Sequence, residues 1–111
     1  MFYIKEDGTI HLTRGDTARF SISVENELTQ QKYTIGENDK LTLTVKKKVK
    51  DTEALLQKTA IGVSLFHIKP EDTSSMSFGK YKYDVQLTTS TGDVYTIVEP
   101  TTFEILPEVT Y

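Results

Sequence analysis

The sequence predicts an all-β fold, an immunoglobulin-like antiparallel β-sandwich of seven to nine strands with at most one short helical turn. Two observations carry this prediction. Apolar and polar residues alternate along several short runs, as they do in strands that bury one face. Turn-forming residues, mostly Gly, Asp, Asn and Ser, separate these runs at roughly the 8–12-residue spacing that is typical of sandwiches and barrels.

Three runs show the alternation most clearly: residues 18–24, 41–46 and 80–87. In the third run Tyr81, Tyr83, Val85 and Leu87 share one parity. A one-residue slip in strand register would therefore turn this whole apolar set to solvent. The parity of the strands places seven side chains in the core: Phe20, Ile22, Leu43, Val45, Tyr83, Val85 and Phe103.

Shorter extended runs occupy much of the remaining chain: residues 10–12, 63–68, 94–98 and 102–106. Residues 53–58 fit either one helical turn or a short strand, because they are too few for an independent helix. About one helical turn is expected near residues 70–77, and Asp72 or Thr73 is placed to cap such a turn over residues 74–76. Pro100 lies between the last two runs, and we expect the chain to bend or to change sheet there because proline cannot donate to a strand ladder.

Length and composition indicate one domain, residues 1–111, with a single core. Of the 111 residues, 37% are hydrophobic and 26% are charged, and the net charge is −3. A mildly negative chain has no general attraction for nucleic acid. No apolar run has the length of a signal-peptide core or of a membrane span. We therefore expect a protein made in a cytoplasm, with neither nucleic acid nor membrane as a partner.

No group of residues in the sequence suggests catalysis or metal binding. Cysteine is absent, which excludes disulfides and thiol chemistry. The two histidines, His11 and His67, each lie in an expected strand without a second ligand at metal-binding spacing. We therefore predict that the protein is not an enzyme and has no catalytic, metal-binding or cofactor-binding residues and no cofactor. The sequence does not identify its binding residues.

Two short motifs have both a structural and a functional interpretation. The tripeptide Arg14-Gly15-Asp16 matches an integrin-recognition sequence, but it runs directly into the strand expected from Thr17, which favours a structural turn. Residues 46–50 contain four lysines without interleaved aromatic residues. We interpret this run as the end or the guarded edge of a strand rather than as a nucleic-acid patch.

Three segments occur in an order and spacing found in a known family. Residues 14–22 lead from Arg-Gly-Asp-Thr into Phe-Ser-Ile, residues 68–73 read Ile-Lys-Pro-Glu-Asp-Thr, and residues 79–87 read Gly-Lys-Tyr-Lys-Tyr-Asp-Val-Gln-Leu. A closing Thr-Phe-Glu-Ile follows at residues 102–105. Together these segments resemble the N-terminal domain of the baseplate upper protein family, found in tail proteins of phages and prophages of Gram-positive bacteria. The resemblance spans residues 10–109.

The resemblance implies an immunoglobulin-like sandwich that helps to build a multimeric virion appendage near the host-adhesion device. The implied function is that of a non-enzymatic structural component of a phage or prophage tail, located in the virion and assembled in the bacterial host cytoplasm. The implied partners are other tail or baseplate proteins, with a homo-oligomer as a further option. Larger family members continue into coiled-coil or receptor-attachment segments, so this chain is either a small tail component or part of a longer protein.

The alternative function is a carbohydrate-binding or adhesin-like module. Such a module needs several aromatic rings on one exposed face. The alternation places Tyr81 and Tyr83 in the core, and it leaves undecided the positions of four other tyrosines: Tyr3, Tyr33, Tyr95 and Tyr111.

Overall fold

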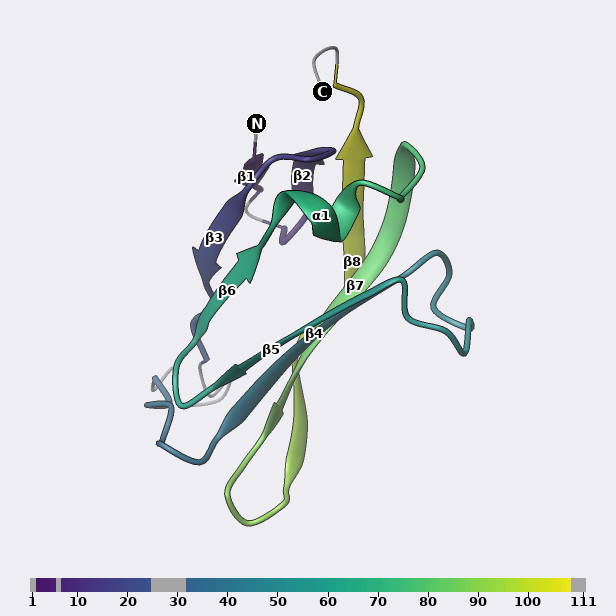
Figure 1. Ribbon diagram of the computed structural model, residues 1–111. Coiled ribbons are helices and arrows are strands. Elements are labelled where there is room, and N and C mark those ends of the chain that lie inside the picture. The colour runs from purple at the N-terminus through teal and green to yellow at the C-terminus, as the bar shows by residue number, and fades with distance from the viewer. Residues whose placement is uncertain (1, 6, 25–31, 109–111) are drawn as a thin grey trace.

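The computed structural model is built almost entirely of β-strands and describes residues 2–5, 7–24 and 32–108 (Figure 1). The elements in chain order are β1 (Phe2–Ile4), β2 (Ile10–Thr13), β3 (Ala18–Ser21), β4 (Lys40–Lys46), β5 (Leu56–Ile61), β6 (Leu65–Ile68), α1 (Pro70–Thr73), β7 (Gly79–Thr88) and β8 (Val94–Leu106). The prediction of an all-β fold with one short helical turn is confirmed, and the described residues form eight strands, within the predicted range.

The strands form two sheets of unequal size. Six strands pair in the order β1-β2-β8-β7-β4-β5, and β3 pairs with β6 in a second, two-stranded sheet. All of these pairs are antiparallel except β2 and β8, which run parallel with Ile10 opposite Phe103. The predicted purely antiparallel arrangement is wrong for this pair. The two strands come from opposite ends of the chain, and a long connection, unlike a tight hairpin, lets strands pair in either direction.

The large sheet curls, and the small sheet lies over the open side of the curl (Figure 1). Aromatic rings bridge one seam between the sheets: Phe2 of β1 stacks on Phe20 of β3 at 5.4 Å between ring centroids, and Phe20 lies 5.8 Å from Phe66 of β6. An ion pair bridges the other seam, where Lys58 of β5 lies 2.6 Å from Asp72 of α1. The two sheets therefore enclose one common core.

The core contains nearly all the side chains that parity places there. Six of the seven predicted core residues are buried, and their exposed fractions run from 0% to 8%. Ile22 is only partly buried, although it packs against the core, because β3 ends one residue before it. The burial pattern of β7 follows its parity, with Tyr81, Tyr83, Val85 and Leu87 all buried.

Two local predictions concern short segments. Of the two alternatives for residues 53–58, the structure has the strand, since β5 begins at Leu56. The single helical turn lies within the expected region, residues 70–77, but it covers Pro70–Thr73 rather than residues 74–76. Proline is favoured in the first turn of a helix. The Asp72 carboxylate accepts a hydrogen bond from the Lys69 amide at 2.8 Å, which fixes the start of the helix before Asp72 rather than after it.

Pro100 does not move the chain to another sheet. β8 continues through it for 13 residues, and β7 pairs with it on both sides of the proline. Tyr83 lies opposite Thr101 while Val85 lies opposite Val98, so Asp84 alone faces two residues of β8. The register shifts by one residue again before Gln86. Such bulges bend a strand locally and increase its twist, and they admit a proline without ending the ladder.

The phenylalanine contacts at the first seam give a stability prediction. Phe20→Ala removes a buried ring that contacts Phe2 of β1 in the large sheet and Phe66 of β6 in the small sheet. We expect the free energy of unfolding to fall by about 3–5 kcal/mol. Urea unfolding followed by circular dichroism measures this loss. The control is Val63→Ala at a side chain that is 54% exposed, which should change stability by no more than about 0.5 kcal/mol. Equal effects from the two variants would contradict the role of Phe20 at the seam.

Candidate functional site

The outer face of the large sheet carries an open cavity of about 320 Å³, here called the outer-face cavity, next to the loop formed by residues 47–55. Six polar side chains of β4, β5 and β7 line it: Thr44, Lys46, Gln57, Lys82, Asp84 and Gln86. They alternate with the buried residues of the same strands, so the period of two that fills the core also gathers them on the opposite face. Val49 of the loop and Pro100 of β8 add apolar surface to the lining.

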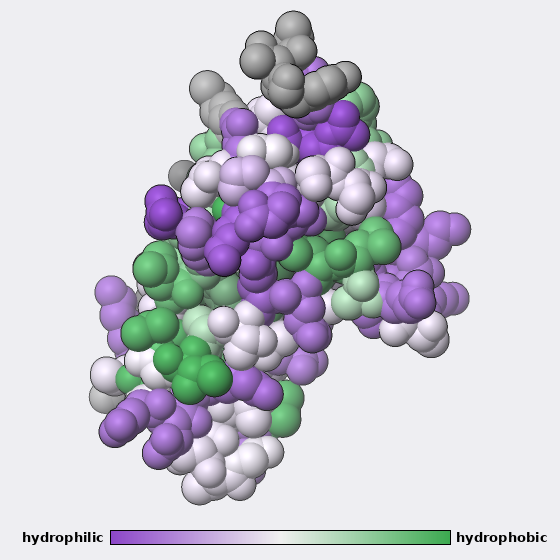
Figure 2. Space-filling view, in the orientation of Figure 1, coloured by the Kyte–Doolittle hydropathy of each residue, from purple (hydrophilic) through white to green (hydrophobic). Residues whose placement is uncertain are grey.

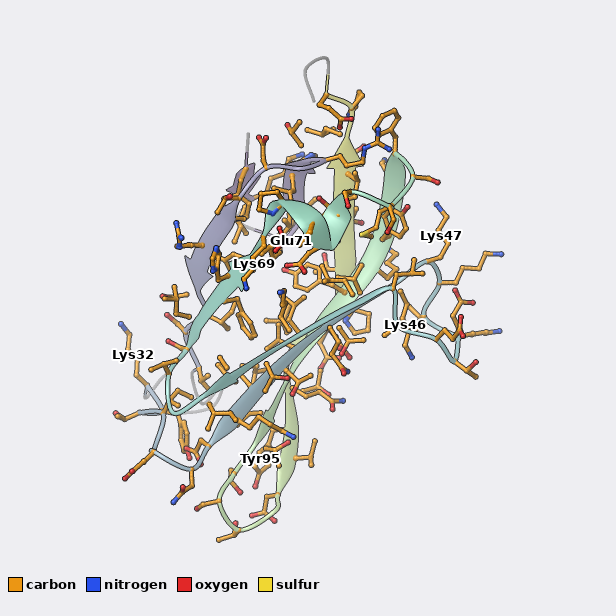
Figure 3. All side chains as sticks on the ribbon, viewed as in Figure 1. Lys32, Lys46, Lys47, Lys69, Glu71 and Tyr95 are labelled. Carbon is orange, nitrogen blue, oxygen red and sulfur yellow. The ribbon has the colours of Figure 1, made fainter. Side chains whose placement is uncertain are left out.

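Two lysines in this cavity occupy paired positions. Lys46 and Lys82 are directly opposite in the register of β4 and β7, and Figure 3 shows Lys46 at the end of β4 beside the loop. The Lys82 ammonium donates to the Thr102 hydroxyl at 3.4 Å. Among the described residues, neither lysine has a carboxylate within ion-pair distance. Thr102 belongs to β8, so the Lys82 ammonium is drawn to the side of β7 away from β4.

The remaining groups of the cavity both donate and accept hydrogen bonds. Burial raises the pKa of the Asp84 carboxyl, and the nearby charge of Lys46 opposes this rise. The Gln57 amide donates to the Thr44 hydroxyl at 3.1 Å, which leaves its side-chain carbonyl oxygen as an acceptor. The cavity thus combines two cations, one carboxylate and side-chain amides, a set that can orient a small polar ligand.

A second feature is the unpaired edge of β8, here called the open β8 edge and formed by residues 94–98. β8 pairs with β7 over residues 94–105 but with β2 only over residues 103–106. Among the residues that the structure describes, the open β8 edge therefore has a strand partner on one side only. Val94 and Tyr95 are each 55% exposed there, and the β7–β8 hairpin projects from the rest of the molecule (Figure 1). An exposed edge offers backbone hydrogen-bonding groups to another strand.

A third feature is an apolar patch at the turn between β5 and β6. Ile61, Val63 and Leu65 are 67%, 54% and 50% exposed, and they form part of the hydrophobic surface at the lower left of Figure 2. Val63 and Leu65 also line an open groove of about 460 Å³ next to the small sheet. Contiguous exposed apolar surface of this kind is typical of places where proteins meet.

One buried carboxylate holds the loops at the hairpin end of the molecule together. Asp39 is only 3% exposed, and it accepts hydrogen bonds from the Tyr33 hydroxyl at 2.6 Å, the Gly36 amide at 2.8 Å and the Ser90 amide at 3.1 Å. These donors, the Tyr33 hydroxyl first, hold the pKa of the Asp39 carboxyl below its ordinary value, although burial acts the other way. Sequence patterns indicated only a turn here, because two of the three donors belong to other segments of the chain.

The Arg14-Gly15-Asp16 tripeptide is part of the folded structure. The Arg14 guanidinium forms a two-pronged ion pair with Glu108, 2.7 Å at its shortest, and lies 4.3 Å from the centre of the Phe78 ring. Gly15 has φ of 83°, and its amide donates to the hydroxyl of the fully buried Thr73 at 2.9 Å. The interpretation as a structural turn is confirmed, since Arg14 is held against the molecule rather than displayed.

The lysine run marks the end of an interior strand. Lys46 is the last residue of β4, which has neighbours on both sides, and the following lysines lie in the loop. The ammonium of Lys47 donates to the Lys80 carbonyl at 3.3 Å and lies 4.6 Å from the centre of the Tyr81 ring. The interpretation as a strand end is confirmed, and the interpretation as a guarded sheet edge is wrong.

The tyrosines divide between core and surface. Tyr81 and Tyr83 are buried, as their parity predicts. Tyr33 is 42% exposed and Tyr95 is 55% exposed, so both present ring surface near the hairpin. The side chain of Tyr3 and the whole of Tyr111 lie outside the described residues.

The two histidines lie in different sheets. His11 of β2 has its Nδ1 2.9 Å from a carboxylate oxygen of Glu104 on β8, and His67 belongs to β6. Within residues 2–5, 7–24 and 32–108, no three His, Asp or Glu side chains gather closely enough to hold a metal ion. In the same part of the chain, no helix has the length and apolar character needed to cross a membrane.

Comparison of the chain with protein-family models, curated proteins and solved structures gave no match. The resemblance to the baseplate upper protein family therefore stays a prediction.

The Gly15 turn gives a prediction about backbone strain. A β-carbon at Gly15 would meet no atom within 4 Å, so the cost of Gly15→Ala comes from its positive φ alone. We expect a loss of about 1–2 kcal/mol in the free energy of unfolding, measured by urea titration. Gly15→Asn is the matched control, because asparagine tolerates the left-handed region and should cost less. Equal stability of all three proteins would show that the turn is not strained.

Asp39 gives a prediction about pH. Its carboxyl has a lower pKa in the folded than in the unfolded protein, so it contributes stability above the ordinary Asp pKa of 3.8, and this contribution is lost as pH falls through the folded value. We expect the thermal midpoint of the wild type to fall between about pH 5 and pH 2, and Asp39→Asn to be less stable at pH 5 with a weaker acid dependence. Glu37→Gln, at an exposed carboxylate in the same loop, should leave the profile unchanged. Identical profiles for wild type and Asp39→Asn would refute this assignment.

Proposed function

We propose that the protein is a non-enzymatic structural component of a phage or prophage tail or baseplate, located in the virion, and that it acts by assembling with other tail proteins. The open β8 edge is the observation that carries the assembly role. The proposal of a tail component draws on the resemblance to the baseplate upper protein family. The apolar patch formed by Ile61, Val63 and Leu65 is a further surface suited to contact with another protein.

The open β8 edge is suited to pairing with a strand of another protein. Soluble proteins usually guard such edges with charged side chains, proline or a covering segment. Residues 94–98 contain none of these guards, since they read Val-Tyr-Thr-Ile-Val, and charge returns only at Asp93 and Glu99. An extended segment added here would continue the large sheet through backbone hydrogen bonds, and adjacent side chains would supply specificity.

The charges at the two ends of the edge favour a different protein over a second copy. Symmetric antiparallel pairing of two copies, centred on Thr96, would pair the whole uncharged run. It would also place Asp93 of each copy opposite Glu99 of the other, and like charges opposite each other are destabilising. A partner strand that carries lysine or arginine at both ends of an uncharged run removes this conflict. We therefore assign the open β8 edge to a heterologous tail protein.

The carbohydrate-binding or adhesin-like alternative has one specific observation in its favour, the two exposed rings of Tyr33 and Tyr95. A sugar platform built on them would use the same end of the molecule as the open β8 edge. The two functions are distinguished by whether the protein is found in virus particles, as a tail component would be.

The test is mass spectrometry of particles purified from an induced lysate of a strain that encodes the chain. We expect the protein in intact particles, together with tail proteins. Val94→Lys should fold and yet be lost from the particles, because a lysine guards the edge and repels a basic partner strand. The matched control is Thr59→Lys, which adds the same charge at an exposed position of β5 and should be retained.

Two outcomes would defeat the proposal. Absence of the wild-type protein from intact particles would remove the tail assignment and leave the ligand-binding alternative. Retention of Val94→Lys at wild-type levels would show that the open β8 edge is not the assembly surface.

A further inference from the structure

We propose that the outer-face cavity binds the anionic group of a small hydroxylated ligand, a sugar acid or a polyol phosphate, between Lys46 and Lys82. The shared chemistry is a negative charge on a hydroxylated carbon chain. This inference does not rest on the assembly role, because the cavity uses outward-facing side chains of β4, β5 and β7, whereas the open β8 edge offers backbone groups. The two surfaces are neighbours, since the Gln86 side-chain amide donates to the Thr96 hydroxyl at 3.5 Å.

The first argument is that the cavity contains two lysines without carboxylate partners. Lys46 and Lys82 occupy paired positions of β4 and β7, and among the described residues no carboxylate lies within ion-pair distance of either. The Lys82 ammonium reaches the Thr102 hydroxyl of β8, a neutral partner that leaves its charge uncompensated. An anion bound in the cavity would accept a charge-assisted hydrogen bond from each ammonium.

The second argument is the chemistry of the remaining lining. The two lysines and Asp84 together carry a net charge of +1, which fits a ligand with one anionic group. Asp84 and the side-chain oxygen of Gln57 accept hydrogen bonds from hydroxyl groups, and Gln86 can donate or accept through its side-chain amide. A volume of about 320 Å³ lies at the small end of the range for ligand sites, so it fits one sugar or polyol unit.

The third argument concerns what the cavity lacks. Its lining contains one aromatic residue, Tyr83, whose ring points into the core and lies edge-on to Phe103 at 6.1 Å. No ring in the lining is therefore available for stacking on a nucleic-acid base or on the apolar face of a neutral sugar. Recognition has to come from charge and hydrogen bonds, so a neutral sugar should bind poorly or not at all.

The test is a titration of the 15N-labelled protein followed by two-dimensional NMR. The probes are sodium glucuronate and sodium glycerol phosphate, with glucose and sodium chloride at matched concentration and ionic strength as controls. We expect saturable shifts of the side-chain amide signals of Gln57 and Gln86 with at least one of the two anions and with neither control. Shifts with glucuronate alone name a sugar acid as the ligand class, and shifts with glycerol phosphate alone name a polyol phosphate.

Matched variants separate the site from general electrostatics. Lys46→Gln and Lys82→Gln should each weaken binding about tenfold or more, because each removes a charge-assisted hydrogen bond. The controls are Lys40→Gln on the same face of β4 and Lys80→Gln on the same face of β7, neither of which lines the cavity. Both controls make the same change in net charge and should bind within about twofold of the wild type.

A stability measurement excludes a trivial loss of binding. Each cavity variant replaces a lysine that has no carboxylate partner among the described residues, so its thermal midpoint should stay close to that of the wild type. The proposal is overturned if neither anion produces saturable shifts, if sodium chloride produces the same shifts, or if the Lys46 and Lys82 variants bind as the wild type does.

Discussion

The bulged pairing of β7 with β8 is the constraint on which the other features of this molecule depend. β8 is the longest strand, and it must keep apolar side chains on the core side over its whole length while Pro100 interrupts its hydrogen bonding. Two one-residue shifts of register achieve this. They keep Phe103 and Ile105, which lie opposite Ile10 and Leu12 of β2, in the core, and they leave Ile97 and Val98 packed against it. Without the bulges, Glu99 rather than Val98 would lie opposite the buried Val85.

Both candidate surfaces follow from that strand. The first bulge lies opposite Asp84, and it brings Pro100 into the lining of the outer-face cavity. The open β8 edge begins where β2 no longer covers β8, because the chain turns back at Asp7-Gly8 and β2 starts only opposite Phe103. The Tyr83 hydroxyl, whose pKa burial raises to about 12, donates to the Gly8 carbonyl and fixes this turn to β7. Tyr83 of β7 thus helps to determine where β2 begins, and therefore how much of β8 is left without a partner on that side.

Local patterns in the sequence predict the strands whose faces differ most. β4 and β7 alternate strictly, because each has one face on the core and one on solvent, and their buried residues were predicted correctly. Features that depend on distant partners were not predictable in this way. The parallel pairing of β2 with β8 joins the two ends of the chain, and the Asp39 network joins three loops. Of the two outcomes expected at Pro100, a bend or a change of sheet, the change of sheet is wrong, and the bulge found there has no clear local signature in the sequence.

The outer-face cavity likewise combines features that local sequence patterns predict with features that depend on distant contacts. Each lysine in the run at residues 46–50 looked like part of a solvated strand end, and most of the run has that role. The facing of Lys46 and Lys82 could be seen only once the register of β4 on β7 was known. A one-residue difference in that register would have placed the two side chains on opposite faces of the sheet. The sequence therefore contained the parts of the cavity but not their arrangement.

The distribution of charge gives the two candidate surfaces opposite character. The chain has a net charge of −3, yet six of its 13 Lys and Arg residues lie in the run at residues 46–50 and at positions 80 and 82, on one end of the large sheet. The open β8 edge lies at the other end of β7, between Asp93 and Glu99. Opposite local potentials on one small domain favour different partners at each end, since each end repels what the other attracts. A basic partner strand is drawn to the acidic end and an anionic ligand to the basic end. The two surfaces meet at Gln86, which lines the cavity and donates to the Thr96 hydroxyl of the edge.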